Sequence, residues 1–275
     1  MLSRVTLVEY LNYNLSFWTF IAGPIQRFGD FRDQFESMSQ ASGNVSSREV
    51  LLGLNRVMFG YFRMFVMGAY LQPLAQPKTF LAQPGWGHLL VLLGSFPLYM
   101  YMNFSGYCDI VVGLARCVGF RLPENFSNPY LARNMVDFWS RWHITLSQFF
   151  RDYIYFPLHI ALSRRIPIMA SMILVSLFSF ILMGVWHGSS PSFALFGLIH
   201  GLGVVGTNLY ADWLRRILGK ERFRDYGRNV WIRGTAVVLC QSYVVLSFLP
   251  FQYDRIELAA IGQRLSSVVG LGWLR

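Results

Sequence analysis

Apolar and polar residues alternate along this chain in long blocks, and the blocks predict a series of helices. The clearest block runs from Ile166 to Trp186, carries no charge, and is about long enough to cross a bilayer as a helix. Arg164 and Arg165 precede it, as is common at a cytoplasmic end. Four further apolar stretches are candidates for spanning helices: 51–72, 89–107, 191–210 and 234–253.

The two ends of the chain have a weaker pattern. Residues 1–26 are apolar and aromatic but interrupted by polar side chains, and residues 27–48 mix charges with three phenylalanines. We expect the first to be an interfacial or short membrane segment and the second an amphipathic helix at the membrane surface. The tail, 254–275, is moderately amphipathic and is expected to form another surface helix.

A helical periodicity extends over residues 136–155, after a polar segment at 121–137 that predicts a loop on the water side. The pattern predicts one continuous helix with an aromatic face that includes His143. That face carries Trp139, Trp142, His143, Leu146, Phe149, Phe150 and Tyr153, and the opposite face carries Arg141, Thr145, Gln148 and Asp152.

Composition supports a membrane protein. Hydrophobic residues make up 54% of the chain and charged residues only 14%, which argues against a soluble domain of this length. The net charge of +10 is spread between the apolar runs, with seven basic residues in 212–233. Topology explains this distribution better than nucleic-acid binding does, and the basic segment is expected to face the cytoplasm, where it could attract an acidic carrier or anionic lipid.

His187 is the first candidate for chemistry. It ends the apolar run of 166–186, is bracketed by Gly184 and Gly188, and precedes Pro191, which can begin the next helix. The pattern places its imidazole at a break between two helices, and a histidine at membrane depth is usually functional. His200 is a second such histidine, but Gly197 and Gly201 beside it favour a packed, hydrogen-bonded role.

Several charged residues within apolar segments need partners. Asp109 has Arg116 seven positions later on the same helical face, which predicts a structural ion pair ahead of a chemical role. Arg56 and Arg63 share one face of the 51–72 helix and either bind an anionic donor or extend to the headgroups. Cys108, Cys117 and Cys240 lack metal-ligand spacing and are expected to be buried, so no metal site is predicted.

The available chemistry narrows to histidine. The chain has no Gly-x-Ser-x-Gly elbow and no His-Glu-x-x-His pattern. A neutral imidazole in a dry cavity is a competent general base for an alcohol that attacks an activated acyl group.

Six blocks of this sequence resemble those of the membrane-bound O-acyltransferases, in particular the bacterial branch that includes alginate O-acetylase and the teichoic-acid D-alanyl transfer protein. The resemblance covers nearly the whole chain, and the blocks occur in the family's order. They are 22–25 (AGPI), 104–109 (FSGYCD), 119–126 (GFRLPENF), 138–147 (FWSRWHITLS), 150–155 (FRDYIY) and 184–188 (GVWHG).

The resemblance implies an all-α, polytopic fold with interfacial helices and a central tunnel. It implies that His187 is the essential catalytic histidine and that His143 is its partner at the tunnel. Asp109, Arg141, Trp186 and Arg151 are predicted as supporting residues.

The implied reaction moves an acyl group to a hydroxyl, and acetyl is the acyl group expected. The donor is a cytoplasmic thioester, acetyl-CoA or an acyl carrier protein, used as co-substrate, with no permanently bound cofactor. The acceptor is an exported polysaccharide or a periplasmic relay protein, and the location is the bacterial inner membrane.

Relatives in this family have further helices before the segment that matches residue 1, and the chain is expected to be one membrane domain that is incomplete at the front and at the back. Three alternatives remain open: D-alanyl transfer from a carrier protein to a lipid-linked polymer, a transporter that relays protons through its histidines, and a non-catalytic remnant.

Overall fold

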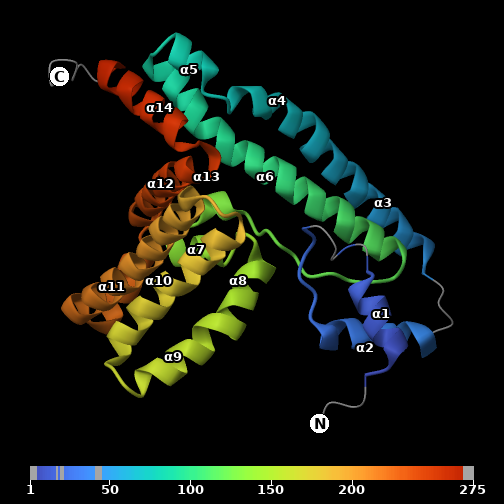
Figure 1. Cartoon of the computed structure of the whole chain (residues 1–275). Coiled ribbons are helices and arrows are strands. Elements are labelled where there is room, and N and C mark those ends of the chain that lie inside the picture. Colours follow the sequence, from blue (N-terminus) through green and yellow to red (C-terminus); the bar gives the residue numbers. More distant parts are fainter. Residues whose placement is uncertain (1–4, 17, 19–21, 41–44, 269–275) are drawn as a thin grey trace. The chain divides into compact units, whose positions relative to one another are not determined.

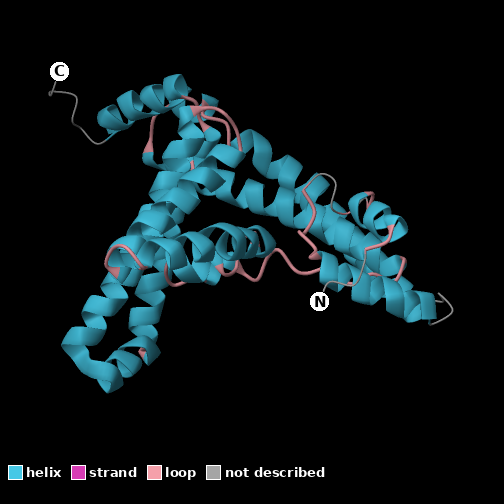
Figure 2. Ribbon diagram, turned by 60° about the horizontal axis from the view of Figure 1, so that its bottom comes forward, coloured by secondary structure: helices cyan, strands magenta, loops and turns pink. Residues whose placement is uncertain are grey.

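The computed structural model describes residues 5–16, 18, 22–40 and 45–268. Throughout these residues the chain forms helices joined by turns and loops, with no β-strand (Figure 2). The contacts divide the chain into two compact units, one of residues 1–73 and 98–126 and the other of residues 74–97 and 127–275. The all-α prediction is confirmed, whereas the single domain stays a prediction.

The first unit contains the N-terminal helices and most of a long helical pair. Its elements are α1 (Leu7–Asn14), α2 (Phe28–Gln40), α3 (Ser47–Tyr61), the π-helical turn η1 (Phe62–Met67), nearly all of α4 (Gly68–Leu74) and the second part of α6 (Trp86–Cys117). The helix predicted within 27–48 is α2, and Arg32 on it binds Glu9 on α1 at 3.1 Å. Helix α6 is continuous through Pro97, so the apolar run of 89–107 and the residues after it form one element.

Helices α3 and α6 lie side by side because glycines remove the side chains between them (Figure 1). A Cβ atom on Gly60 would lie 2.5 Å from the carbonyl oxygen of Gly106, and one on Gly106 would lie 2.7 Å from that of Gly60. The two backbones are therefore in direct contact, as in close helix pairs of membrane proteins.

The second unit contains the remaining elements: α5 (Lys78–Ala82), the start of α6, η2 (Pro129–Leu131), α7 (Met135–Trp139), α8 (Ile144–Phe150), the π-helical turn η3 (Arg151–Tyr155), α9 (Phe156–Ser163), α10 (Ile168–Trp186), α11 (Pro191–Arg228), α12 (Val230–Ser247), α13 (Leu249–Gln252) and α14 (Arg255–Val268). The spanning helix predicted at 166–186 is α10. Helix α5 lies between the predicted helices 51–72 and 89–107, and the C-terminal surface segment includes α14.

Helices α10 and α11 form an antiparallel pair in which glycine again sets the separation (Figure 1). A Cβ atom on Gly197 would clash with the carbonyl oxygen of Phe180, and one on Gly184 with that of Phe193. The predicted role of Gly197 in close helix packing is confirmed. This contact fixes the turn between the two helices, where His187 lies.

Replacing Gly197 by alanine is expected to lower the thermal unfolding midpoint of the detergent-purified protein, because a backbone oxygen cannot move aside as a side chain can. Overpacking of this kind costs about 1–3 kcal/mol. Gly206→Ala is the matched control: Gly206 is on the same helix, nothing lies within 4 Å of a Cβ atom there, and alanine favours helix. Equal midpoints for the two variants would contradict the close contact.

The prediction of one continuous helix over 136–155 is wrong. Helix α7 ends at Trp139, a turn follows, and α8 begins at Ile144. After Phe150 the α-helix changes into the π-helical turn η3. His143 has a φ of 42°, in the left-handed region, so the helix cannot pass through it. The helical pattern extends across the break because Trp139, Trp142, Leu146 and Phe150 are all buried, although Phe149 and Tyr153, predicted on the same face, are exposed.

The polar segment 212–233 also differs from the prediction. Helix α11 does not end near Tyr210 but continues to Arg228, interrupted only at Gly219, where φ is 72°. Five stretches of the described chain are long and apolar enough to cross a membrane: Ser47–Ala82, Trp86–Cys117, Ile168–Trp186, Pro191–Arg228 and Val230–Gln252. The predicted polytopic organisation is confirmed in this respect.

Candidate active site

His187 is the residue directly after α10, in the short turn that leads to α11. Its amide donates to the carbonyl oxygen of Gly184 at 3.0 Å, which closes the last turn of α10. Ser190 then caps α11 by accepting from the amide of Ser192, and Pro191 is the first helical residue. The turn is fixed at both sides, so the predicted break between helices at His187 is confirmed.

Aromatic rings surround the imidazole of His187 on three sides. The rings of Trp186, Phe196 and Phe251 lie edge-to-face with it, at centroid distances of 4.9, 6.2 and 5.1 Å. The side chain is half-buried, and no described residue forms a hydrogen bond with either ring nitrogen. The ring is held by packing while its nitrogens remain available to a substrate.

His143 lies in the turn between α7 and α8 and is 8% exposed. Its carbonyl oxygen accepts from the amide and the hydroxyl of Ser147, at 3.0 and 3.2 Å, so the first turn of α8 holds its backbone. The neighbouring Trp142 stacks on Phe138 at 5.6 Å and meets Phe248 edge-to-face. The left-handed backbone therefore comes from a packed turn.

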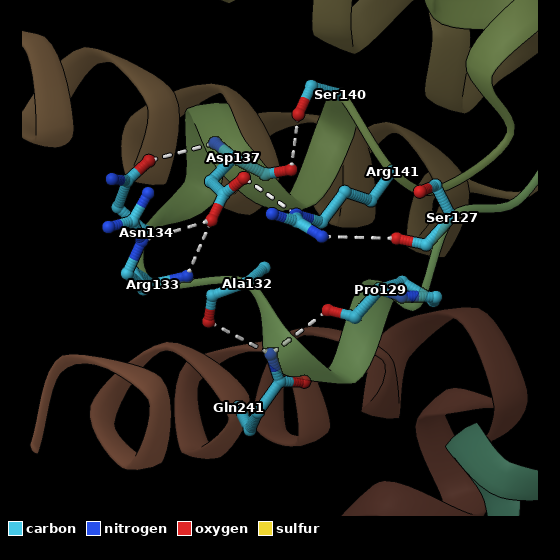
Figure 3. Close-up of polar contacts among 9 residues, drawn as sticks. All are labelled: Ser127, Pro129, Ala132, Arg133, Asn134, Asp137, Ser140, Arg141 and Gln241. Carbon is cyan, nitrogen blue, oxygen red and sulfur yellow. Dashed lines mark hydrogen bonds and ion pairs between the residues drawn. The ribbon is translucent and has the colours of Figure 1, made fainter. Parts of the chain in front are cut away.

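A carboxylate organises this turn, as Figure 3 shows. Asp137 accepts from Nε of Arg141 at 2.7 Å and from the amide of Arg133 at 3.0 Å, and its own amide donates to the side chain of Asn134. Arg141 also donates to the carbonyl oxygen of Ser127. Burial opposes ionisation of Asp137, but the hydrogen bonds from Arg141 and Arg133 outweigh it and lower its pKa.

Asp137→Asn is expected to loosen the turn before His143, because the amide cannot accept from both arginines and leaves Arg141 without its counter-charge. Loss of one such charge-assisted interaction costs about 1–3 kcal/mol. Amide hydrogen exchange should accelerate in residues 138–143. The control is Asp152→Asn, which removes a carboxylate paired with Arg151 in η3. Unchanged exchange in the Asp137 variant would show that the aromatic packing alone holds the turn.

The two candidate histidines belong to the same unit, and the charge of His187 affects the pKa of His143. Burial lowers the pKa of His143 to about 3, and the charge of His187 contributes further in the same direction. Burial also lowers the pKa of His187, to about 4. Both imidazoles are neutral near pH 7, the form that can accept a proton.

These shifts predict a dependence of stability on pH. Between the ordinary value of 6.5 and about 4, the unfolded chain binds a proton at His187 and the folded chain does not. Stability contributed by neutral His187 is therefore lost as the pH falls through this window. The unfolding midpoint should drop less between about pH 7 and about pH 5 in His187→Asn than in the original protein. An identical drop in both would contradict the shifted pKa.

His200 on α11 is completely buried, and its Nε2 lies 2.8 Å from the hydroxyl of Ser247 on α12. Its ring contacts Phe196 at 4.3 Å and Phe248 at 5.6 Å, and Phe196 is one of the rings around His187. This geometry agrees with the packed, hydrogen-bonded role that the sequence favoured over catalysis.

Asp109 lies in the first unit, and the predicted partner for it is wrong. It accepts from Nε of Arg56 at 3.0 Å and from Nη1 of Arg63 at 2.6 Å, while Arg116 binds Glu49 at 2.6 Å. Residues seven apart on one helix are separated by about 10 Å along its axis, whereas α3 presents two arginines within reach. Asp109 thus has the structural ion pair that was expected, with arginines other than the one predicted.

The other predicted supporting residues have separate positions. Trp186 is adjacent to His187 and contacts its ring, with 60% of its surface exposed. Arg141 supports the turn before His143 through Asp137. Arg151 binds its neighbour Asp152 at 2.9 Å, and no contact with either histidine is found for it in the described part of the chain. All three cysteines are free, with Cys108 and Cys240 buried and Cys117 partly exposed.

Sequence reasoning missed two contributors to this site. Asp137 was placed in the polar loop, although Asn134 three residues before it and arginines four residues to either side form a recognisable capping and ion-pair pattern. Phe251 comes from α13, some sixty residues beyond His187 in the sequence, and no local pattern connects the two.

The fold and the site define a multi-pass helical membrane protein with two neutral histidines in one aromatic core. A profile of the MBOAT, membrane-bound O-acyltransferase family, matches residues 2–249, and the chain belongs to this family. The predicted resemblance is confirmed.

Three curated relatives show how far the similarity extends. The chain is 26% identical over 254 residues to a teichoic acid D-alanyltransferase of Bacillus subtilis (strain 168), a match that covers 90% of this chain and 62% of that protein. It is 34% identical over 220 residues to a peptidoglycan O-acetyltransferase of Helicobacter pylori, with coverage of 78% and 40%. It is 33% identical over 195 residues to a probable alginate O-acetylase of Azotobacter vinelandii, with coverage of 71% and 37%. The chain therefore spans less than two thirds of the length of these relatives.

Proposed function

We propose that this chain carries the catalytic histidines of an O-acyltransferase that moves an acyl group, with acetyl as the expected group, from a thioester donor to a hydroxyl. The observation that carries the proposal is His187: a neutral, half-buried imidazole with no hydrogen bond to its ring nitrogens from a described residue, in the same unit as buried His143, whose pKa its charge lowers. Such a group can accept a proton from an alcohol at neutral pH.

In the proposed reaction, a ring nitrogen of His187 takes the proton of the acceptor hydroxyl as its oxygen attacks the carbonyl carbon of the thioester. The tetrahedral intermediate collapses with cleavage of the carbon–sulfur bond. The leaving thiolate takes the proton back from the imidazolium, so the products are an ester and a free thiol. No metal or permanently bound cofactor enters these steps.

His143 orients the donor thioester or shares the proton with His187. Its ring is more deeply buried than that of His187, and the Asp137 network fixes its turn. Trp186 closes one side of the reacting imidazole, whereas Arg141 acts only through the turn. Asp109 and Arg151 have ion-pair partners elsewhere and are the weakest members of the proposed set.

The acceptor we propose is a hydroxyl of an exported polysaccharide or of a periplasmic relay protein, and the location is the bacterial inner membrane. The names of the Helicobacter pylori and Azotobacter vinelandii relatives, an O-acetyltransferase of peptidoglycan and an O-acetylase of alginate, support this proposal. Acetyl-CoA, or an acyl carrier protein, is the expected cytoplasmic co-substrate.

D-alanyl transfer from a carrier protein to a lipid-linked polymer is the second candidate. The matches to teichoic acid D-alanyltransferases of Bacillus subtilis and Streptococcus thermophilus cover 90% and 91% of this chain, more than the 71% and 78% of the two acetyl-transfer relatives. The same histidines would serve, because the attacked bond is again a thioester.

The identity of the acyl donor distinguishes acetyl transfer from D-alanyl transfer. Membranes from cells that make the protein are supplied either with radiolabelled acetyl-CoA or with radiolabelled D-alanyl carrier protein, and the label in the polymer fraction is counted. We expect label from acetyl-CoA, absent with His187→Ala. Label from the D-alanyl carrier alone would establish the second candidate. Label from neither, with a folded protein, would contradict acyl transfer, and substrate movement without transfer would favour a transporter.

A further inference from the structure

A large cavity lies in the second unit, between α11, α12 and the segment that leads into α7. Its volume is about 1050 Å³, and most of its lining is apolar, with Leu202, Leu214, Trp231, Ala236 and Leu239 among the side chains and Gly206 at an open position on α11. Ligand pockets measure roughly 300–1,000 Å³, so this volume suits a large ligand. Neither His143 nor His187 lines it, so it is distinct from the candidate active site.

The charged side chains that line this cavity are both positive. Arg133 and Arg233 line it, and no carboxylate does so among the described residues. Arg133 shares Asp137 with Arg141, at 3.6 Å from Nε to the carboxylate, and remains 43% exposed. Arg233 forms no ion pair with a described carboxylate and is exposed. Two guanidinium groups are thus available to an anion.

Several other polar groups on the lining are already hydrogen-bonded. The hydroxyls of Tyr210 and Tyr226 bond to each other at 3.0 Å, Tyr243 donates to the carbonyl oxygen of Ile199, and Thr207 donates to that of Gly203. What remains for a ligand is mostly apolar surface with two cations, together with the side chains of Thr235 and Trp231, for which no hydrogen bond is found among the described residues. Both α11 and α12 are long and apolar enough to cross a membrane, so the cavity lies along two candidate spanning helices.

We propose that this cavity is a binding site for an anionic membrane lipid, with an acyl chain along the apolar wall and the phosphate at Arg133 and Arg233. A zwitterionic lipid offers the same chains but adds a positive headgroup charge next to the guanidinium groups. The preference for a net negative headgroup is therefore electrostatic, with about a fivefold contribution from each arginine near the membrane surface.

The test is native mass spectrometry of the detergent-purified protein, titrated with phosphatidylglycerol or with phosphatidylcholine of the same acyl chains. We expect phosphatidylglycerol to be retained preferentially. Arg133→Gln combined with Arg233→Gln should reduce this preference, whereas Arg216→Gln, an exposed arginine paired with Asp212 outside the cavity, should leave it unchanged.

The apolar half of the site is tested by filling the cavity. Gly206→Leu adds a large side chain to the lining at a position where nothing lies within 4 Å of a Cβ atom. The variant should lose bound phosphatidylglycerol. Gly262→Leu on α14 is the matched control, because Gly262 is equally open and does not line the cavity. Ala236→Phe on α12 provides a second filling variant if Gly206→Leu does not fold.

Three results would overturn the proposal. The first is equal retention of the two lipids by the original protein. The second is full phosphatidylglycerol binding by a folded filling variant, which would mean that the lipid binds elsewhere. The third is competition by glycerol 3-phosphate as strong as that by the whole lipid, which would reduce the site to an anion site without chains.

Discussion

Replacing His187 by alanine is expected to lower acyl transfer by a factor of about 10²–10⁴, the usual contribution of a positioned general base. The loss should appear in kcat, because the imidazole takes the proton only as the acceptor oxygen attacks. The protein should still insert and fold, since the helix pair around residue 187 is held by Gly184 and Gly197 and by aromatic packing. The assay is transfer of labelled acyl groups in membranes, at matched protein levels.

His88→Ala is the control for the loss of any histidine. The ring of His88 bonds to the carbonyl oxygen of Gln83 at the start of α6, and it contacts none of the rings around His187. This variant should transfer at the original rate. Transfer by His187→Ala at a near-original rate would remove His187 from the mechanism.

His143→Asn is expected to have the second largest effect, a fall in transfer of about 10². Asparagine is chosen because it tolerates the left-handed backbone at this position, where alanine would add strain. The substitution therefore removes the imidazole and keeps the turn. A rise in the KM for the donor would assign His143 to orienting the thioester, and a fall in kcat alone would assign it to sharing the proton.

A purely structural role for His143 predicts something different. In that case His143→Asn, which preserves the turn, would transfer normally, while His143→Ala would fail because the turn is disturbed. Amide hydrogen exchange over residues 138–147 separates the two outcomes, since only a disturbed turn exchanges faster.

The sequence predicted the helices that are uniform along their length and failed where a helix is broken. The run of 166–186 has no charge and no internal glycine before its end, so periodicity and length located α10 to within two residues. The segment 136–155 has the same helical pattern, but three backbone features interrupt it: the end of α7, the left-handed His143 and the π-helical η3. Hydrophobic periodicity reports which side chains face the core and does not detect a turn that preserves those faces.

The candidate site was only partly predictable for a similar reason. His187 and His143 were identified from apolar surroundings and from resemblance, and the structure brings both into one unit. The ion pairs of Asp109 could not be chosen from the sequence, because Arg56, Arg63 and Arg116 were all available and only the packing of α3 on α6 selects the first two. Phe251 was unpredictable because the contact depends on the path of the whole chain between α10 and α13.

The most direct test of the central claim is chemical rescue of His187→Ala. Its side chain is half-buried, so a small base can reach the space that the imidazole leaves. We predict that added imidazole restores part of the acyl transfer in membranes, and that a series of substituted imidazoles restores more as their basicity increases. A folded His187→Ala protein whose transfer no imidazole raises would contradict the claim that the missing group is the base.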